Sequence, residues 1–221
     1  SYWGPLFFAG TWSSATVIIY SVGPGGHPGW RTHLGLAVLS IPLWWWFELV
    51  NTRVGNWEYL RPVEYEAWEY AVFASLAFST VIPALHSAWR FFLRFDSPER
   101  LSAHYQGDVF HVVELGSGLV SVGLVFLIPD VFFPLVWVGP FLMLDGTVGL
   151  QRGGSLLREI IGENVRRAAL IAGAGLLCGF LWEFWNFWAS PKWVYDIAYL
   201  EVLHVFEMPL AGYLGYVPFA W

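Results

Sequence analysis

Residues Leu43–Leu60 read LWWWFELVNTRVGNWEYL, and residues Leu181–Ile197 repeat the pattern as LWEFWNFWASPKWVYDI. Both segments place an acid three residues before an asparagine, and a Trp-x-Tyr triplet follows. The matching positions, at offsets of 135 or 136 residues, are Glu48/Glu183, Asn51/Asn186, Trp57/Trp193, Tyr59/Tyr195, Glu66/Glu201 and Pro83/Pro218. Because internal repetition determines architecture, these matches predict that one structural unit occurs twice.

The composition indicates a membrane protein. Of 221 residues, 57% are hydrophobic and 13% are charged, whereas roughly 25% are charged in an ordinary soluble domain. The fifteen tryptophans favour the same class, since indole rings concentrate at the membrane–water boundary. The net charge of −6 offers no basic surface to nucleic acid. The single cysteine, Cys178, cannot form an internal disulfide, and we interpret it as a buried thiol.

The hydropathy pattern predicts an all-α fold, a polytopic transmembrane bundle of about seven helices. A membrane-spanning helix needs about 20 mostly apolar residues, and alternation with a period of two is absent from the sequence. The expected helices cover residues 5–22, 33–52, 68–95, 109–128, 131–150, 168–188 and 200–221.

These helices divide into three parts. Residues 1–95 form a first three-helix repeat, residues 96–130 hold a linker helix, and residues 131–221 form the second repeat. A single linker helix gives both repeats the same direction across the bilayer, related by a pseudo-twofold axis along the membrane normal. This plan is similar to that of the SWEET sugar transporters in architecture alone, because the sequence carries no motif of that family.

The positive charges predict an orientation. Eight arginines lie in or beside one set of loops, and the opposite loops hold only Arg53, Arg61 and Lys192. By the positive-inside rule, we expect a multi-pass protein of the cell inner membrane with its N-terminus outside and its C-terminus in the cytoplasm. Residues 155–167 have apolar side chains near helical spacing and are expected to lie on the inner membrane surface.

The FE-x2-N and NW-x-Y signatures, with the runs FEMP and GYLGYVP near the end, resemble an uncharacterised group of bacterial multi-pass membrane proteins. The resemblance covers most of the chain and implies no activity. A rhodopsin is excluded, because retinal attachment needs a lysine within the bilayer. The only lysine, Lys192, falls in a predicted outer loop.

Ionisable side chains within a membrane cost at least a few kcal/mol each, so each is a candidate functional residue. The predicted topology gathers them into two clusters. The outer cluster, a predicted ligand-binding site below Trp57, Tyr59, Trp193 and Tyr195, contains Glu48, Asn51, Glu183, Asn186, His204 and Glu207. The inner polar cluster contains His86, His111, Glu114 and Asp145.

Both clusters also have a structural interpretation. The two Glu-x2-Asn pairs can pin neighbouring helices together through hydrogen bonds. Glu207 can bond to Asn186 or to a tyrosine inside a helix that is kinked by Pro209.

Metal binding is mostly excluded. A six-ligand di-iron site fails because His111 and Glu114 fall at the opposite membrane face from the other candidate ligands. A smaller site of Glu183, His204 and Glu207 stays open, and neither a metal nor a cofactor is assigned.

No Gly-x-Ser-x-Gly, Walker or His-Glu-x2-His motif occurs in the sequence, which lowers the expectation of an enzyme, and no catalytic residue is assigned. We favour an accessory subunit of a larger membrane assembly. Its partners would be membrane lipids and other membrane-protein subunits, and a Trp-lined outer crevice would bind a lipid, quinone or pigment. A proton-coupled or small-solute transporter is the first alternative. An intramembrane enzyme that uses His204 and Glu207 as acid and base is the second.

Overall fold

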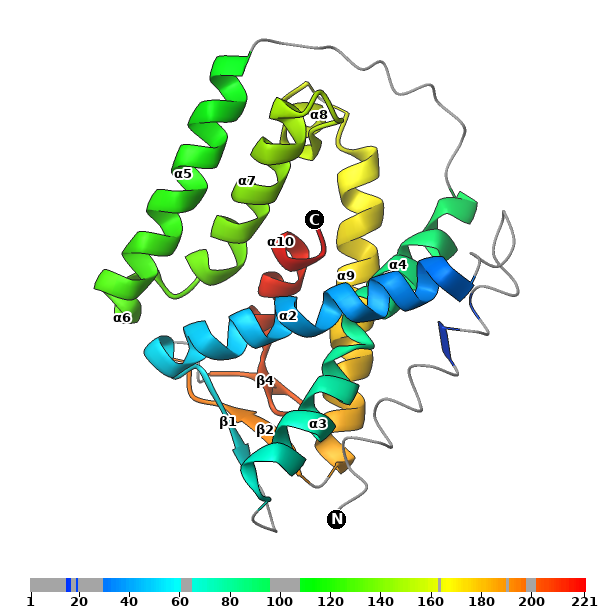
Figure 1. Ribbon diagram of the computed structural model, residues 1–221, viewed down its shortest axis with the longest axis vertical. Coiled ribbons are helices and arrows are strands. Elements are labelled where there is room, and N and C mark those ends of the chain that lie inside the picture. Colours follow the sequence, from blue (N-terminus) through cyan, green and yellow to red (C-terminus); the bar gives the residue numbers. More distant parts are fainter. Residues whose placement is uncertain are drawn as a thin grey trace.

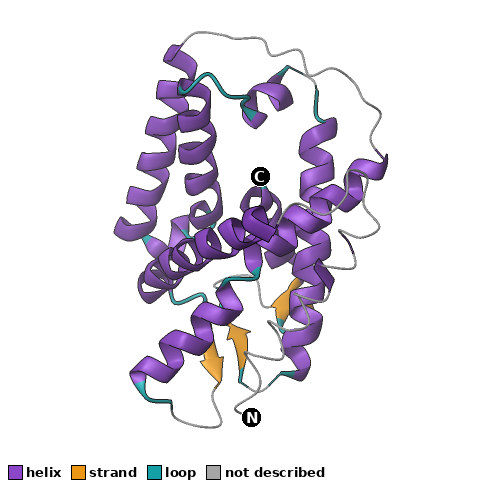
Figure 2. Cartoon of the chain, turned by 45° about the vertical axis from the view of Figure 1, so that its right-hand side comes forward, coloured by secondary structure: helices purple, strands orange, loops and turns teal. Residues whose placement is uncertain are grey.

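The computed structural model describes residues 15–16, 19, 30–60, 65–95, 108–162, 164–189, 191–197 and 202–221. Helices dominate these residues (Figures 1 and 2), which confirms the all-α class, and two short two-stranded sheets accompany them. The helix predicted over residues 5–22 lies outside the described residues, apart from residues 15, 16 and 19.

Four helical segments are long and apolar enough to cross a membrane, as expected for a membrane protein. They match four of the predicted helices closely. The segments are α2 (Trp30–Val54), the consecutive α3 and α4 (Ala67–Phe92), α5 (Asp108–Leu127) and α9 (Arg166–Trp188).

Prolines divide two of the predicted helices into shorter pieces. Proline lacks the N–H that would bond to the carbonyl four residues earlier, so a helix bends or breaks there. One break lies at Ser79–Thr80, before Pro83, and the other at Phe133–Pro134. The resulting elements are α3 (Ala67–Phe78), α4 (Val81–Phe92) with the 3-10 turn η1 (Leu93–Phe95), α6 (Pro129–Phe132) and α7 (Leu135–Leu150).

The helix predicted over residues 200–221 is wrong. Pro209 cannot continue a helix, and Gly212 and Gly215 have low helix propensity. The described part of this segment instead forms β3 (His204–Val205), β4 (Met208–Pro209), the 3-10 helix η2 (Leu210–Gly215) and α10 (Tyr216–Ala220). Its apolar helical part, Leu210–Ala220, is shorter than a membrane span.

The segment predicted to lie on the membrane surface contains one short helix, α8 (Leu156–Ile161). Ser155 caps it, because its Oγ accepts the backbone N–H of Arg158 at 3.1 Å.

The helices pack in a crossed arrangement. α5 lies along α7, and α9 packs against α4 and α10. In Figures 1 and 2, α2 runs across the direction shared by α5, α7 and α9. Close approach of α5 and α7 depends on small residues, because a Cβ added at Gly118 would lie 2.8 Å from the carbonyl oxygen of Gly139.

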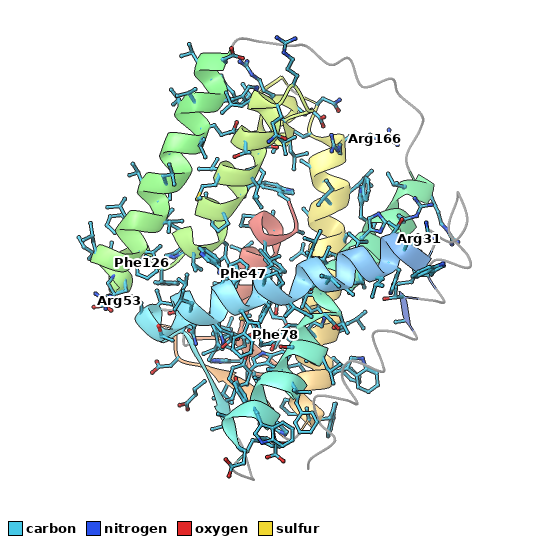
Figure 3. The ribbon with its side chains drawn as sticks, viewed as in Figure 1. Arg31, Phe47, Arg53, Phe78, Phe126 and Arg166 are labelled. Carbon is cyan, nitrogen blue, oxygen red and sulfur yellow. The ribbon has the colours of Figure 1, made fainter. Side chains whose placement is uncertain are left out.

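Aromatic rings fill the middle of the molecule. Trp44 and Phe47 of α2 contact Phe219 of α10, with ring centroids 5.8 Å and 5.5 Å apart. Phe47 also lies 4.9 Å from Trp137 of α7, and Trp44 lies 5.9 Å from Phe78 of α3. Figure 3 shows Phe47 and Phe78 at the crossing of these helices.

Candidate functional site

Two short strands bring the repeated segments together. β1 (Trp57–Leu60) and β2 (Lys192–Tyr195) pair antiparallel, with Trp57 opposite Tyr195 and Tyr59 opposite Trp193. Because Trp57 matches Trp193 and Tyr59 matches Tyr195 in the sequence, the register of the two triplets is symmetric about the pair Glu58–Val194. This strand pair lies at the lower end of the molecule in Figure 1.

Glu48 lies near the C-terminal end of α2 and is half-buried. Its Oε1 accepts three hydrogen bonds, from Trp44 Nε1 at 3.0 Å, Trp57 Nε1 at 3.3 Å and the Tyr59 hydroxyl at 2.5 Å. Trp44 precedes Glu48 by four residues, so both side chains project from one helix face. The carboxyl group therefore joins the end of α2 to the strand that follows it.

Glu183 occupies the matching place near the end of α9 and is fully buried, with 0% of its surface exposed. Its Oε1 accepts the Tyr195 hydroxyl at 2.6 Å, the Tyr216 hydroxyl at 2.7 Å and Trp193 Nε1 at 3.3 Å. Tyr216 belongs to α10, so the third donor comes from the C-terminal helix. The Oε2 atom is buried and has no hydrogen-bond partner within the described residues.

The side-chain amides of Asn51 and Asn186 form hydrogen bonds with the backbones of the two strands. The Asn51 amide donates to the Trp57 carbonyl at 2.7 Å and accepts the Trp57 N–H at 3.3 Å. Asn186 makes the same two bonds to Trp193, at 2.7 Å and 2.9 Å. Each Glu-x2-Asn pair thus fastens a strand to the end of its own helix. Glu183 also makes a bond between neighbouring helices, of the kind expected from the sequence, because Tyr216 of α10 donates to it.

Both tyrosines of the strand pair stay protonated to high pH. Burial raises the pKa of Tyr59 well above its usual value, and the nearby carboxyl group of Glu48 adds to the shift. The pKa of Tyr195 is also raised well above its usual value, first by burial and then by Glu183. A protonated phenol donates a hydrogen bond, so these directions agree with the donor roles of the two hydroxyls.

Glu207 and His204 lie outside any helix. Glu207 is in the turn between β3 and β4, and its Oε1 accepts an ion-paired hydrogen bond from Lys192 Nζ, not from Asn186 or a tyrosine. The carbonyl of Val205, which precedes Pro209 by four residues, accepts the Tyr213 hydroxyl at 3.1 Å. His204 is an exposed residue of β3.

The small metal site that the sequence left open is not formed. Among the described residues, no group of three or more His, Cys, Asp or Glu side chains is placed to hold a metal ion. Neutral N–H and O–H donors occupy Oε1 of Glu183, and Lys192 occupies Oε1 of Glu207.

The inner polar cluster is partly assembled, at the opposite end of the molecule from the strand pair. His111 Nδ1 lies 3.1 Å from Oε2 of Glu114 on α5, and both residues are buried. Asp145 of α7 interacts with Glu114. Its two carboxyl oxygens also accept the Ser155 hydroxyl at 2.7 Å and the backbone N–H groups that start α8, at 2.8 Å and 3.0 Å.

His86 does not join this group. It lies half-buried on α4, where its ring centroid is 5.9 Å from that of Trp89. Its electrostatic neighbours are Arg90 and His33. Similar depth in the predicted topology was the only reason to group His86 with residues on α5 and α7.

Two hydrogen-bond donors, Trp44 to Glu48 and Tyr216 to Glu183, were not predicted from the sequence. Trp44 carried a signal, because it precedes Glu48 by one helical turn. Tyr216 carried none, since the position 135 residues earlier is Val81.

Comparison of the chain with protein-family models, with curated proteins and with solved structures found no match.

Proposed function

We propose that the chain is a non-catalytic accessory subunit of a larger membrane assembly, surrounded by lipids and other membrane-protein subunits. One observation carries this proposal. Glu48, Glu183 and Glu207 are bonded to the chain's own groups, while an apolar face of the candidate membrane span α2 is left uncovered by the described residues.

The polar side chains have partners that explain their presence. Glu48 and Glu183 each accept three hydrogen bonds, and Glu207 is paired with Lys192. An enzyme that used His204 and Glu207 as acid and base would need Glu207 to be free for proton transfer. The ion pair with Lys192 makes that role less suitable than a structural one.

The exposed face of α2 is apolar between two charged ends. Leu34, Val38, Leu39 and Leu49 are each more than half exposed, at 54–62%. Arg31 and Arg53 mark the two ends of this helix (Figure 3). An uncovered apolar face of this kind suits a second membrane helix or lipid chains.

A shallow groove beside this face offers a place for a hydrocarbon chain. It has a volume of about 390 Å³, lies between α2 and α3, and is lined mainly by Ile41, Val72 and Leu76. Its Ser75 hydroxyl already accepts Trp45 Nε1 at 3.0 Å. We infer that this groove, whose lining contains no tryptophan, takes the apolar chain of a lipid, quinone or pigment in place of the Trp-lined outer crevice expected from the sequence, since its walls offer little to a polar headgroup.

We further infer that the repeated segments belong to two duplicated units, with the strand pair on the outer face of the inner membrane. The matching hydrogen bonds of Glu48 and Glu183, and the symmetric strand register, support this. A cysteine at position 58 should react with an impermeant maleimide from outside, and one at position 152 only from the cytoplasm. The reverse labelling pattern would refute the orientation.

Photocrosslinking tests the subunit role. A benzophenone amino acid at Leu39 of α2 should yield a protein adduct of defined mass in native membranes. The same probe at Val120 of α5, which is 62% exposed against 61% for Leu39, should give lipid adducts alone. A density map of the tagged assembly should then show a partner along α2. Monomeric particles, or loss of an activity in Glu183→Gln with assembly intact, would refute the proposal.

A proton-coupled carrier is the second candidate, and one observation favours it. Oε2 of Glu183 and Oε1 of Glu114 are buried without partners in the described part of the chain, at opposite ends of the molecule. Buried carboxyl groups are typical of proton pathways in membranes. Proton uptake by proteoliposomes that is lost in both Glu114→Gln and Glu183→Gln would favour the carrier over the subunit.

A further inference from the structure

A small polar cavity has neither Glu48 nor Glu183 in its lining. Its volume is about 190 Å³, and it lies where α2 ends, α6 begins and β2 ends. Its polar lining comes from Asn56, Asp130 and Asp196.

The backbone holds two of these residues together. Gly55 adopts a φ of +66°, which favours glycine, and its N–H bonds to the carbonyl of Asn51 at 2.8 Å. This turn ends α2 and places Asn56 before β1. The Asp196 N–H then donates to the Asn56 carbonyl at 3.0 Å. Asn56 and Asp196 are therefore fixed neighbours through main-chain bonds.

The Asn56 side chain lacks a partner. Asn56 is 8% exposed, and no hydrogen bond of its carboxamide group occurs among the residues that the structure describes. The residue lines the cavity, so an occupant with affinity for an amide oxygen would give this group a partner.

Two exposed aspartates, Asp130 and Asp196, supply negative charge to the cavity. Neither Asp130 nor Asp196 forms an ion pair within the described ranges. Lys192, the residue that matches Asn56 in the second repeat, is paired with Glu207. The neighbouring cation, Arg53, donates its Nε–H to the carbonyl of Phe126 at 3.0 Å, and Figure 3 shows the two residues together. Two carboxylates thus face a cavity with no basic residue in its lining.

We propose that this cavity binds a hydrated divalent cation, Ca²⁺ in preference, through oxygen atoms of Asn56, Asp130 and Asp196. Ca²⁺ takes six to eight oxygen ligands, including carboxylates, amide carbonyls and water. The lining holds no His or Cys, which argues against zinc. With two carboxylates, the site belongs among weak calcium sites, for which dissociation constants of about 10⁻⁴–10⁻³ M are typical.

Terbium luminescence tests the site in the intact chain. The protein is reconstituted in phosphatidylcholine nanodiscs, treated with chelator and titrated with Tb³⁺ under tryptophan excitation, since Trp57 follows Asn56. We expect one saturable site per chain from which Ca²⁺ displaces Tb³⁺, and calorimetry should detect the same Ca²⁺ binding. Asp130→Asn and Asp196→Asn should each weaken binding about tenfold or more, because each removes a charged ligand. Asn56→Asp, which adds a carboxylate, should tighten it.

Glu58→Gln is the matched control, because it removes an exposed acid of β1 that does not line the cavity. Its Ca²⁺ affinity should equal that of the parent. Equal weakening in Glu58→Gln would indicate diffuse surface charge and overturn the proposal. Binding retained in the Asp130→Asn/Asp196→Asn double variant would also overturn it, as would no saturable binding up to about 10 mM Ca²⁺, beyond the usual range of weak sites. Unchanged melting of the variants without Ca²⁺ confirms that they are folded.

Discussion

Glu48 and Glu183 each accept hydrogen bonds from the tryptophan and the tyrosine of the strand that follows their own helix, but they differ in the third donor and in burial. The third donor to Glu48 is Trp44 of its own helix, whereas Tyr216 of α10 supplies the third donor to Glu183. Glu48 is half-buried, and Glu183 is fully buried with one oxygen unpartnered within the described residues. The repeated motif sets the local contacts, and the rest of the fold sets how much each contact contributes to stability.

The largest expected difference comes from removing the acceptors. Leucine has a similar volume but leaves the donors of each site unpaired. We expect Glu183→Leu to lower the free energy of unfolding by about 3–5 kcal/mol and Glu48→Leu by about 1–2 kcal/mol. Glu183 is fully buried and its loss also leaves the buried Tyr216 of α10 without an acceptor, whereas Glu48 is half-buried. Denaturant unfolding in detergent micelles, followed by tryptophan fluorescence, measures both values.

Glu58→Leu, on the exposed side of β1, serves as the control for this pair and should change stability by less than about 0.5 kcal/mol. Equal losses at Glu48 and Glu183 would show that α10 adds nothing to the site.

Removal of Asn186 should lower the free energy of unfolding more than removal of Asn51, and both losses should be smaller than that for Glu183→Leu. Asn186 is fully buried, and both of its bonds to Trp193 are short, whereas Asn51 is half-buried and one of its bonds is 3.3 Å long. We expect Asn186→Ala to cost about 2–3 kcal/mol and Asn51→Ala about 1–2 kcal/mol.

Hydrogen exchange gives a second readout for these variants. The Trp193 N–H should lose protection in Asn186→Ala, and the Trp57 N–H should lose it in Asn51→Ala. The exposed Asn164 offers a neutral control. An Asn51→Ala variant that loses more stability than Asn186→Ala would contradict the assigned burial.

The sequence predicted the parts of this fold that local signals determine. Residues 33–52, 109–128 and 168–188 are apolar over a membrane-spanning length, and the structure has helices there. The strand pair that brings together the matching Trp-x-Tyr triplets was not predicted, because the sequence analysis expected helices and loops alone. The absence of an α-helix over the described residues 202–215 was missed, although Pro209, Gly212 and Gly215 stand where the first repeat has Ala74, Ala77 and Thr80.

Contacts between distant elements had no such signal. The pairing of Lys192 with Glu207 depends on the β3–β4 turn, which the predicted helix had excluded. The bond from Tyr216 to Glu183 joins α10 to α9 and has no counterpart in the first repeat. Such contacts depend on how distant elements pack together, and a single sequence carries no direct signal of that packing.

The coupling energy between Tyr216 and each carboxyl group should distinguish the Glu183 site from the Glu48 site. Tyr216→Phe removes one hydroxyl and should cost about 1–2 kcal/mol. In a double-mutant cycle, Tyr216→Phe and Glu183→Gln should show a coupling energy of about 1 kcal/mol, whereas Tyr216→Phe and Glu48→Gln should be additive within about 0.5 kcal/mol. The same unfolding assay supplies all the values. A coupling of similar size with Glu48 would mean that the two carboxyl groups act as one network across the strand pair.

The smallest expected effect is a loss of stability at high pH through Tyr59 and Tyr195. Their pKa values are raised in the folded state by burial and by the neighbouring carboxyl groups. In the unfolded chain a tyrosine titrates near its ordinary value of about 10. The folded state therefore keeps protons that the unfolded state releases, so the stabilisation is complete below pH 10 and falls as the pH rises above it. At pH 10.5 the loss should be about 0.8 kcal/mol per tyrosine. Unfolding titrations between pH 9 and 11 should show a smaller slope in Tyr59→Phe and in Tyr195→Phe, and the smallest in the double variant. An unchanged slope in the double variant would mean that neither phenol is held protonated by its site.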